Sequence, residues 1–343
     1  MTNTKDVLIL GIDTSCDETA AAVTRNGREV LSNVIASQVE VHEIFGGVVP
    51  EIASRHHLRA INGVVEAALC EAGVAGKELD AIAVTKGPGL VGAILIGLAT
   101  AKAMAFALDK PLIGVHHIRG HILSALIEHK ELEPPFLALV VSGGHTSLID
   151  VRGLGEGPGD MKALGSTRDD AAGEAYDKVA RVLGLGYPGG PRLDELAKTG
   201  DPKEAFFKRV TLEGGSLDFS FSGLKTGVLN HINSRRQAGL PVNGADIAAG
   251  FQESVIDVLS LKTGAALERT GYKTLVLAGG VAANSALRAR MKKDAERTGA
   301  RLYIPSKALC TDNAAMIACA GYYRYLTGGA DSLSLDAYAT LPL

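Results

Sequence analysis

The chain contains one pattern twice: an apolar run, a short polar turn and a second apolar run. The first copy reads GIDTSCDETAAAV from residue 11, and the second reads FLALVVSGGHTSLIDV from residue 136. Apolar runs of this length, broken by glycine, serine and aspartate, are typical of paired strands. Stretches of helical periodicity follow each copy, so the sequence predicts a duplicated α/β architecture.

The pattern around these strand pairs indicates mixed sheets with helices. From Pro50 to Gly73 the apolar positions keep a helical period, with proline near the start and glycine at the end, as is usual for a helix. The region LDFSFSGLKTG, residues 217–227, shows no regular period. The expected strands cover 7–13, 19–25, 28–38, 81–89, 112–117 and 136–151, with two more beginning near 274 and 301; the expected helices cover 50–73, 90–108, 169–183, 245–271, the stretch after 284 and 312–327.

A charged, proline-rich segment, EHKELEPP, separates the two copies. Clusters of proline and polar residues between periodic segments mark loops and linkers. We therefore expect a domain boundary between His121 and Pro135. The expected first lobe comprises residues 1–125 and 310–343, and the second comprises residues 126–309.

Composition excludes several classes of protein. The 343 residues are 46% hydrophobic and 21% charged, which is enough apolar material for a buried core, and the 41 glycines follow no collagen-like period. The four cysteines are scattered without a CxxC pair, which predicts reduced thiols and a cytoplasmic location. No export signal is visible, and the apolar stretch 90–108 contains Lys102, so we expect a buried helix there and no membrane association. A net charge of −3 predicts no general attraction to nucleic acid.

Three glycine-rich turns follow apolar strands and are candidate anion-binding turns. They are Gly11–Ser15, Ser142–Thr146 and Ala278–Val281, and the third has Asn284 behind it. A glycine lets backbone N–H groups approach a phosphate that a Cβ would block. Each turn taken alone is also compatible with an ordinary chain reversal. None matches a P-loop or a G-x-G-x-x-G fingerprint, so neither of those nucleotide sites is predicted.

Two histidines, His117 and His121, stand four residues apart in HHIRGH, just after a predicted strand. On a helix this spacing puts both imidazoles on one face, where they can bind one divalent ion. Asp312, in CTDNAAM at a predicted helix start, is a candidate third ligand, although an ordinary N-cap is the alternative. The segment lacks the glutamate of H-E-x-x-H, so it offers no metalloprotease base.

Acidic and basic clusters supply weaker candidates. Asp17 and Glu18 adjoin the first turn, while Asp170, Glu174 and Asp177 fall on one face of the helix predicted at 169–183. A solvated turn is the alternative for Asp17 and Glu18, whereas a solvated surface is the default for the helix face, with a ligand clamp at Asp177 and the Gly189-Gly190 turn as the alternative. The basic candidates for an RNA surface, which as solvated faces need no further explanation, are the segment 55–59, Arg235 with Arg236, and Arg288, Arg290, Lys292, Lys293 and Arg297.

The motifs together resemble one known family across nearly the whole chain. They are SCDET, HEIFGGVVPEIASR, GPGLVGAILIG, VHHIRGH, LVVSGGHTSL, DDAAGEAYDKVARVLGLGYPGGP, DFSFSGLKT, AGGVAANSALR and CTDNAAMIA. They resemble the bacterial TsaD family, the tRNA N6-adenosine threonylcarbamoyltransferases. The resemblance implies an α/β, two-lobed, actin-like ATPase (ASKHA) fold with duplicated mixed sheets, which agrees with the repeated pattern.

The resemblance also implies a site. His117, His121 and Asp312 would hold one divalent metal, Fe²⁺ or Zn²⁺. Archaeal relatives carry a tyrosine ligand where this chain has Val140, so substrate or water is expected to fill the remaining coordination positions. The residues implied to contact the adenylate of the substrate are Val140, Val141, Ser142, Gly143, Gly144, Asp177, Gly190, Asp194 and Asn284.

The implied reaction moves the threonylcarbamoyl group from threonylcarbamoyl-AMP to N6 of adenosine 37 in tRNAs that read ANN codons, and AMP leaves. Asp13 and Glu18 are the candidate bases for the amine proton. The implied partners are tRNA, a TsaB-like paralogue and a TsaE-like ATPase. Three alternatives are a small-molecule kinase or ATPase of the same fold, a metalloglycoprotease and a non-catalytic scaffold. Two imidazoles favour a transition metal over the Mg²⁺ of a kinase.

Overall fold

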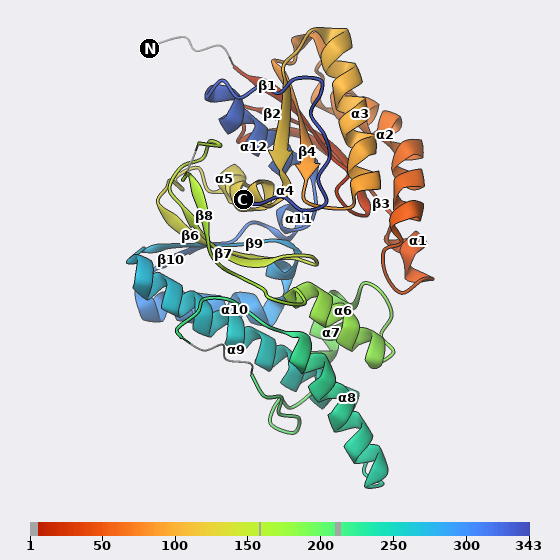
Figure 1. The fold of residues 1–343 in the computed structure, drawn as a ribbon, viewed down its shortest axis with the longest axis vertical. Helices are drawn as coiled ribbons and strands as arrows, with labels where there is room; N and C mark the ends of the chain where they lie inside the picture. The colour runs from red at the N-terminus through yellow and green to blue at the C-terminus, as the bar shows by residue number, and fades with distance from the viewer. Residues whose placement is uncertain (1–5, 158, 210–213) are drawn as a thin grey trace. The chain divides into compact units, whose positions relative to one another are not determined.

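The computed structural model describes residues 6–157, 159–209 and 214–343 (Figure 1). The chain forms two compact units. Unit 1 comprises Met1–Pro134, Val151–Met161 and Pro305–Leu343, and unit 2 comprises Pro135–Asp150 and Lys162–Ile304. The chain therefore passes from unit 1 to unit 2 more than once.

Unit 1 is built on a five-stranded mixed sheet with the order β3-β2-β1-β4-β5. The antiparallel part is a meander in which β1 pairs with β2 and β2 with β3, whereas β4 pairs in parallel with β1 and with β5. Aliphatic runs broken by turns account for these strands. Their bounds are β1 Leu8–Asp13, β2 Glu18–Arg25, β3 Glu29–Ser37, β4 Ala81–Gly87 and β5 Leu112–His116.

Helices pack on both faces of this sheet. Leu10 and Ile12 of β1 share a hydrophobic cluster with α2 and α3, while Gly11, between them, faces α12. This alternation is the period of two expected of a strand with both faces buried. The helices of unit 1 are α1 Val39–Glu43, α2 Pro50–Ala72, α3 Val91–Leu108, α4 His117–Leu123, α5 Ala125–Glu128, α11 Lys307–Cys310 and α12 Ala314–Leu326, with a 3-10 turn at Gly76–Glu78.

Gly11 is required by the close packing of α12 against β1. A Cβ at this position would lie 2.3 Å from the Ala314 carbonyl oxygen and 2.6 Å from the Ala318 nitrogen. Both are backbone atoms, which cannot rotate away as a side chain would. The glycine therefore brings α12, and the residues that precede it, close to the end of β1.

Among the described residues, α3 is the one helix long and apolar enough to cross a membrane by length and composition. Only one side of it is buried. Ile94, Leu98 and Ala101 pack into the core of unit 1, whereas Leu95 and Phe106 are exposed. The expectation of a buried helix is thus met on one face only.

Unit 2 repeats the plan of unit 1. Its sheet has the order β10-β9-β6-β7-β8, with β9 pairing in parallel with both β6 and β10. Read from β8, this is the order of the first sheet read from β3, so the predicted duplication is confirmed. The strands are β6 Phe136–Val141, β7 Thr146–Val151, β8 Met161–Ser166, β9 Thr274–Ala278 and β10 Arg301–Tyr303; the helices are α6 Ala172–Val182, α7 Gly189–Ala197, α8 Ser222–Gln237, α9 Gly244–Thr270 and α10 Ser285–Thr298, with a 3-10 turn at Gly280–Ala283.

The sequence-based expectations differ from the structure in several places, and β8 and α7 were not expected at all. The region around 217–227, expected to be irregular, opens α8 at Ser222. The compact units also differ from the expected lobes: 126–134 and 305–309 lie in unit 1, as does 151–161. Specific contacts explain this, because Glu128 accepts a hydrogen bond from the Ser306 nitrogen at 2.6 Å and Glu156 pairs with Arg324 at 2.9 Å.

Candidate functional site

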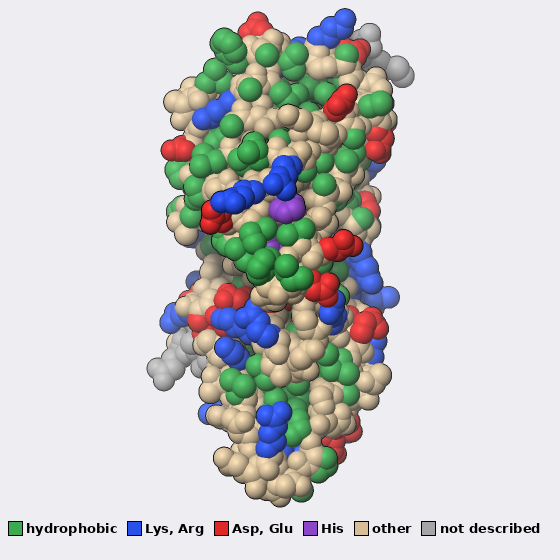
Figure 2. All heavy atoms as spheres, turned by 90° about the vertical axis from the view of Figure 1, so that its right-hand side faces the viewer, with side chains coloured by type: hydrophobic (Ala, Val, Ile, Leu, Met, Phe, Trp, Pro, Cys, Tyr) green, Lys and Arg blue, Asp and Glu red, His purple; other side chains and the backbone are tan. Residues whose placement is uncertain are grey.

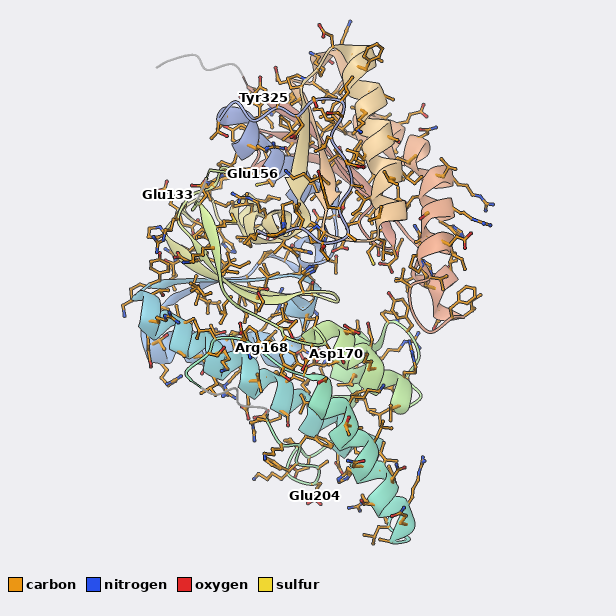
Figure 3. The ribbon with its side chains drawn as sticks, in the orientation of Figure 1. Glu133, Glu156, Arg168, Asp170, Glu204 and Tyr325 are labelled. Carbon is orange, nitrogen blue, oxygen red and sulfur yellow. The ribbon has the colours of Figure 1, made fainter. Side chains whose placement is uncertain are left out.

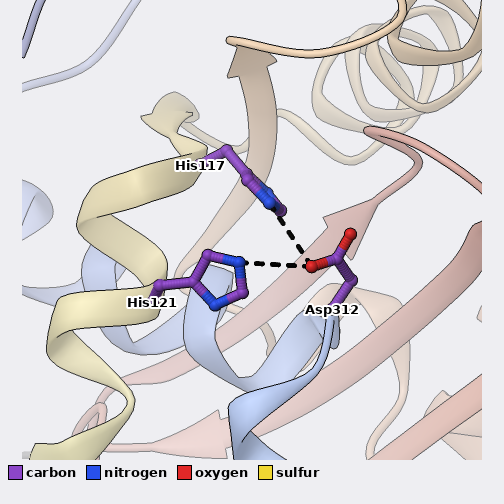
Figure 4. A group of neighbouring side chains, drawn as sticks. All are labelled: His117, His121 and Asp312. Carbon is purple, nitrogen blue, oxygen red and sulfur yellow. Dashed lines mark ion pairs between the residues drawn. The ribbon is translucent and has the colours of Figure 1, made fainter. Parts of the chain in front are cut away.

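The predicted metal ligands lie together in unit 1 (Figure 4). The segment after β5 turns into α4 at His117, so His117 and His121 are one helical turn apart, with ring centroids 4.7 Å from each other. Asp312 lies between α11 and α12, and its Oδ1 is 3.5 Å from Nε2 of His117 and 3.2 Å from Nε2 of His121. One ligand atom from each residue fits within 4.8 Å of the others.

Buried polar atoms without partners mark this cluster as a ligand site. His121 is completely buried, and apart from the 3.2 Å contact of its Nε2 with Asp312 neither ring nitrogen has a hydrogen-bond partner within the described residues. Nδ1 of His117 is likewise without one. Buried polar groups are nearly always satisfied, so such a concentration of exceptions requires an explanation. Two imidazoles and a carboxylate are a suitable donor set for Zn²⁺ or Fe²⁺ and would leave coordination positions open.

The charges of the cluster favour a cation. Burial alone would lower the pKa of His117, but the negative charges of Asp312 and Asp13 outweigh it and raise that pKa to about 9. Burial alone would raise the pKa of Asp312, but the two histidines hold it well below its usual range. In the metal-free protein a proton on His117 thus supplies the positive charge that a bound metal ion would supply.

Asp13 lies behind His117, at the end of β1. Its Oδ2 is 3.5 Å from Nδ1 of His117 and has no hydrogen-bond partner in the described chain, while Oδ1 accepts hydrogen bonds from the Thr85 hydroxyl and the Ser15 nitrogen. Burial is the main cause of a raised pKa at Asp13. A carboxylate behind a metal-binding histidine fixes the ring orientation and raises the basicity of the ligand nitrogen.

Glu18, at the start of β2, is a titratable carboxyl close to this cluster. Its Oε1 accepts a hydrogen bond from the Ser37 hydroxyl at 2.8 Å, and its Oε2 is buried without a partner among the described residues. Burial, followed by the negative charge of Asp17, raises the pKa of Glu18 to about 7, although the Ser37 bond opposes the shift. Glu18 can therefore exchange a proton near neutral pH.

The loop SCDET is held by a histidine whose role the sequence reasoning missed. His57 is completely buried, its Nε2 donates to the Cys16 carbonyl at 2.9 Å, and its Nδ1 lies 2.8 Å from the Thr19 hydroxyl. It belongs to the segment 55–59, which was a basic candidate for RNA. Its position on the buried side of α2, in step with Ala53 and Ile61, is the signal that could have revealed it.

In unit 2 the turn Ser142–Gly144 follows β6 and presents open backbone. Val140 and Val141 are fully buried, so these two residues can offer a ligand only their main chain. Gly143 and Gly144 are exposed, and nothing lies within 4 Å of where their Cβ atoms would be. The first turn of α6 packs against this turn, since the Gly173 nitrogen donates to the Ser142 carbonyl at 3.2 Å.

The other residues predicted to bind the adenylate are also in unit 2. Asp194 accepts hydrogen bonds from the nitrogen and hydroxyl of Ser285, next to Asn284, which caps α10. Gly279, in the third glycine turn, approaches the Val141 carbonyl so closely that a Cβ would lie 2.5 Å away. Oδ1 of Asp177 accepts a hydrogen bond from the Gly189 nitrogen at 2.9 Å. At the neighbouring Gly190, nothing lies within 4 Å of where a Cβ would be. The Gly279 contact lies at the end of β6, and the other contacts involve α7.

Of the three acids predicted on one helix face, only Glu174 and Asp177 lie on α6. Asp170 lies just before the helix (Figure 3), which begins at Ala172. Lys178 neutralises it with a 2.6 Å ion pair and also contacts Glu174 at 2.9 Å. Asp177 makes the separate Gly189 contact described above. Lys178, which the sequence reasoning did not weigh, therefore supplies positive charge at Asp170 and Glu174, where a solvated face was the default expectation.

A family model described as "TsaD: tRNA N6-adenosine threonylcarbamoyltransferase" matches residues 29–319. The chain is 54% identical over 336 residues to the tRNA N6-adenosine threonylcarbamoyltransferase of Clostridium beijerinckii, covering 98% of both proteins. The protein of that name from Moorella thermoacetica is 55% identical over 335 residues, covering 98% of this chain and 97% of the relative. The chain belongs to the TsaD family.

Solved structures of much lower identity show that this TsaD-family chain has the actin-like ATPase fold. HypF of T. kodakarensis matches 94% of this chain and 48% of its own, with a TM-score of 0.65 and 16% identity. Component A of the (R)-2-hydroxyglutaryl-CoA dehydratase of Acidaminococcus fermentans covers 93% of this chain and 99% of its own, with a TM-score of 0.54 and 17% identity. Two units with equivalent mixed sheets are the predicted architecture, which is thus confirmed.

Proposed function

We propose that this TsaD-family chain transfers the threonylcarbamoyl group from threonylcarbamoyl-AMP to N6 of adenosine 37 in tRNAs that read ANN codons, with release of AMP. The observation that carries the proposal is the convergence of His117, His121 and Asp312 on one ligand position in a chain whose relatives carry this activity by name. The kinase alternative is not favoured, because two imidazoles suit a transition metal better than Mg²⁺.

The unit 2 residues fit the binding of an adenylate. The exposed N–H groups of Gly143 and Gly144 can donate to the phosphate or the carbonyl, since no side chain covers them. Asp194 and Asp177 each have one or both oxygens engaged by neighbouring backbone, which fixes their direction for contact with ribose hydroxyls. An exocyclic adenine amine is a weak nucleophile, so orientation and charge stabilisation are the main needs of this reaction.

A metal ion bound in unit 1 would contribute further electrostatic stabilisation. A divalent ion, Fe²⁺ or Zn²⁺, held by His117, His121 and Asp312 would polarise an oxygen of the adenylate as a Lewis acid. Asp13 orients the ring of His117 through Nδ1. Glu18, whose pKa is raised to about 7, accepts the proton of the attacking amine. Asp13 thus acts as a positioning residue and Glu18 as the base.

The structure offers surfaces for the expected partners. Exposed apolar side chains on α2 and α3 include Leu58, Leu95 and Phe106. These two helices lie on the right-hand side of Figure 1, which faces the viewer in Figure 2. We assign this surface to the TsaB-like paralogue and leave the TsaE-like ATPase to contact the resulting pair, all in the cytoplasm. A Phe106→Asp variant should lose co-elution with the paralogue, whereas a Phe206→Asp variant, which changes an exposed side chain of unit 2, should keep it. Retention by both variants refutes this surface.

For tRNA, the basic residues of α10 divide into two groups. Arg290 pairs with Asp257 at 2.7 Å and Arg297 lies 3.6 Å from Asp294, so their charges are already balanced. Lys292 and Lys293 are exposed and have no ion pair within the described residues. We propose that these two lysines contact the tRNA backbone, and that the double change to glutamine lowers tRNA affinity and its salt dependence.

Mass spectrometry of tRNA nucleosides tests the function directly. Cells depleted of this protein should lose threonylcarbamoyl-adenosine, and the wild-type gene should restore it while a His117→Ala, His121→Ala variant should not. An unchanged nucleoside profile after depletion, or phosphorylation of a metabolite by the pure protein at rates above transfer, would favour the kinase alternative.

A further inference from the structure

The helix that carries the metal ligands presents a buried arginine on its other side. Arg119 is two residues from both His117 and His121, and two residues on an α-helix correspond to roughly 200° of rotation. Arg119 is only 7% exposed. Its side chain lines a cavity of about 320 Å³ within unit 1, which is in the size range of small-molecule sites.

The guanidinium of Arg119 experiences the negative charges of Glu156 and Asp160 but makes no ion pair with either. Its Nη2 is buried and has no hydrogen-bond partner in residues 6–157, 159–209 and 214–343, and no ion pair of Arg119 is found there either. A buried charged group without a partner is costly, and in native proteins it usually has one. The arrangement therefore suits the binding of an anion.

The acid nearest to the cavity is already shared. Glu156, on the segment between β7 and β8 (Figure 3), is 2.9 Å from Nε of Arg324 and 3.4 Å from Nζ of Lys86. Lys86 and Glu156 line the same cavity as Arg119. The cavity wall thus carries two cationic side chains, Lys86 and Arg119, and one side-chain carboxylate, Glu156, which is divided between Lys86 and Arg324 outside the wall. Leu343, the last residue of the sequence, also lines the cavity.

The rest of the wall is held in place and is partly apolar. Nε2 of His116 donates to the Leu341 carbonyl at 3.0 Å, and the Tyr338 nitrogen donates to the Lys86 carbonyl at 2.8 Å, so the tail is tied to the ends of β4 and β5. Met161, Leu341 and Pro342 contribute apolar surface to the cavity. A ligand there would meet positive charge on one side and hydrocarbon on the other.

We propose that this cavity is a second binding site, independent of the transfer reaction, for a small organic anion. Its carboxylate or phosphate group binds Arg119 and Lys86, and its apolar body packs against Met161 and the tail at Leu341. Arginine suits this role because its planar fork can donate two parallel hydrogen bonds to either oxyanion. Because the site lies on α4, a bound anion also fixes the helix that carries His117 and His121.

Isothermal titration calorimetry on the full-length, chelator-treated protein tests the proposal. The probes are phenyl phosphate and hexanoate, which separate the two head groups, inorganic phosphate, which lacks the apolar body, and benzyl alcohol, which lacks the charge. The wild type should bind at least one of the two organic anions with one-to-one stoichiometry, more tightly than inorganic phosphate, and should not bind benzyl alcohol.

Matched variants locate the binding. Arg119→Gln should raise the dissociation constant of the anion by about ten-fold or more, because a charge-assisted hydrogen bond is lost. Arg59→Gln removes the same charge from the exposed side of α2 and should leave the dissociation constant of the anion unchanged. His117→Ala tests whether the anion binds at the metal ligands instead, and it should also leave this constant unchanged. Should Arg119→Gln not fold, Lys86→Gln serves in its place and should also weaken binding. No binding to the wild type, or equal binding by the Arg119 and Lys86 variants, overturns the proposal.

Discussion

Metal binding to the His117, His121 and Asp312 centre should depend steeply on pH. The pKa of His117 is raised to about 9 in the metal-free protein, so near pH 7 this ring is almost fully protonated. A metal ion must displace that proton, because only the neutral ring can be a ligand. Apparent affinity should therefore rise about ten-fold per pH unit from neutrality and level off above about pH 9.

The size of the effect follows from the shift. At pH 7 the solution is about two units below the pKa of His117, so the apparent dissociation constant for the metal is about 100-fold higher than at the plateau. This corresponds to a cost of about 3 kcal/mol. The same raised pKa stabilises the metal-free fold. This contribution is complete below the unfolded pKa of about 6.5 and is lost as pH rises through about 9, so the melting temperature of the metal-free protein should fall across that range.

Competition with a chromophoric chelator across this pH range measures the affinity. Calorimetry in two buffers of different ionisation enthalpy counts the protons released, which should be about one per metal ion near pH 7.5. Asp13→Asn removes one of the two carboxylates that raise the pKa of His117 and should reduce the proton count, whereas Glu51→Gln, an exposed change on α2, should not. A flat affinity profile with no proton release would refute the reasoning.

Two further predictions concern Gly11 and Glu18. Gly11→Ala places a Cβ against the backbone of α12 and should lower the free energy of unfolding in urea by roughly 1–3 kcal/mol. Gly63→Ala, in an open position of α2, should raise it by about 0.5–1 kcal/mol. Equal effects of the two changes would contradict the packing described. Since a base must be deprotonated, the rate of single-turnover transfer should rise with pH through about 7 in the wild type. Glu18→Gln should be slower by about 100-fold or more, and its rate should not show this rise. A variant whose rate still rises with pH in this way rules out Glu18 as the base.

Local spacing explains which parts of the site could be predicted from the sequence. His117 and His121 are one helical turn apart on a short helix, so their convergence requires no knowledge of the tertiary fold. Asp312 was recognisable as a polar residue at a helix start. That Asp13 stands behind His117, and that His57 holds the Cys16 carbonyl, depends on β1, α2 and α4 packing around one sheet, which no local pattern encodes.

The unexpected helix α8 and the position of Asp170 outside α6 have similar causes. The buried residues of α8, Leu224, Val228 and Ile232, are spaced by four, but the polar residues between them and the irregular stretch before them obscure this period. The acidic run before α6 reads as one helical face only if the helix begins before Asp170. The structure begins it later, where the Ala172 nitrogen bonds to the Thr146 hydroxyl at the start of β7.

The role of the metal centre in transfer can be measured in a single turnover. Preformed threonylcarbamoyl-AMP and tRNA are mixed with excess protein that is metal-free, metal-reconstituted, or reconstituted and carrying His117→Ala, each with the partner proteins present, and the modified nucleoside is followed by mass spectrometry. We predict rapid transfer by the reconstituted wild type alone, with the metal-free protein and the variant slower by about 100-fold or more. Transfer at the full rate by metal-free protein would contradict the account.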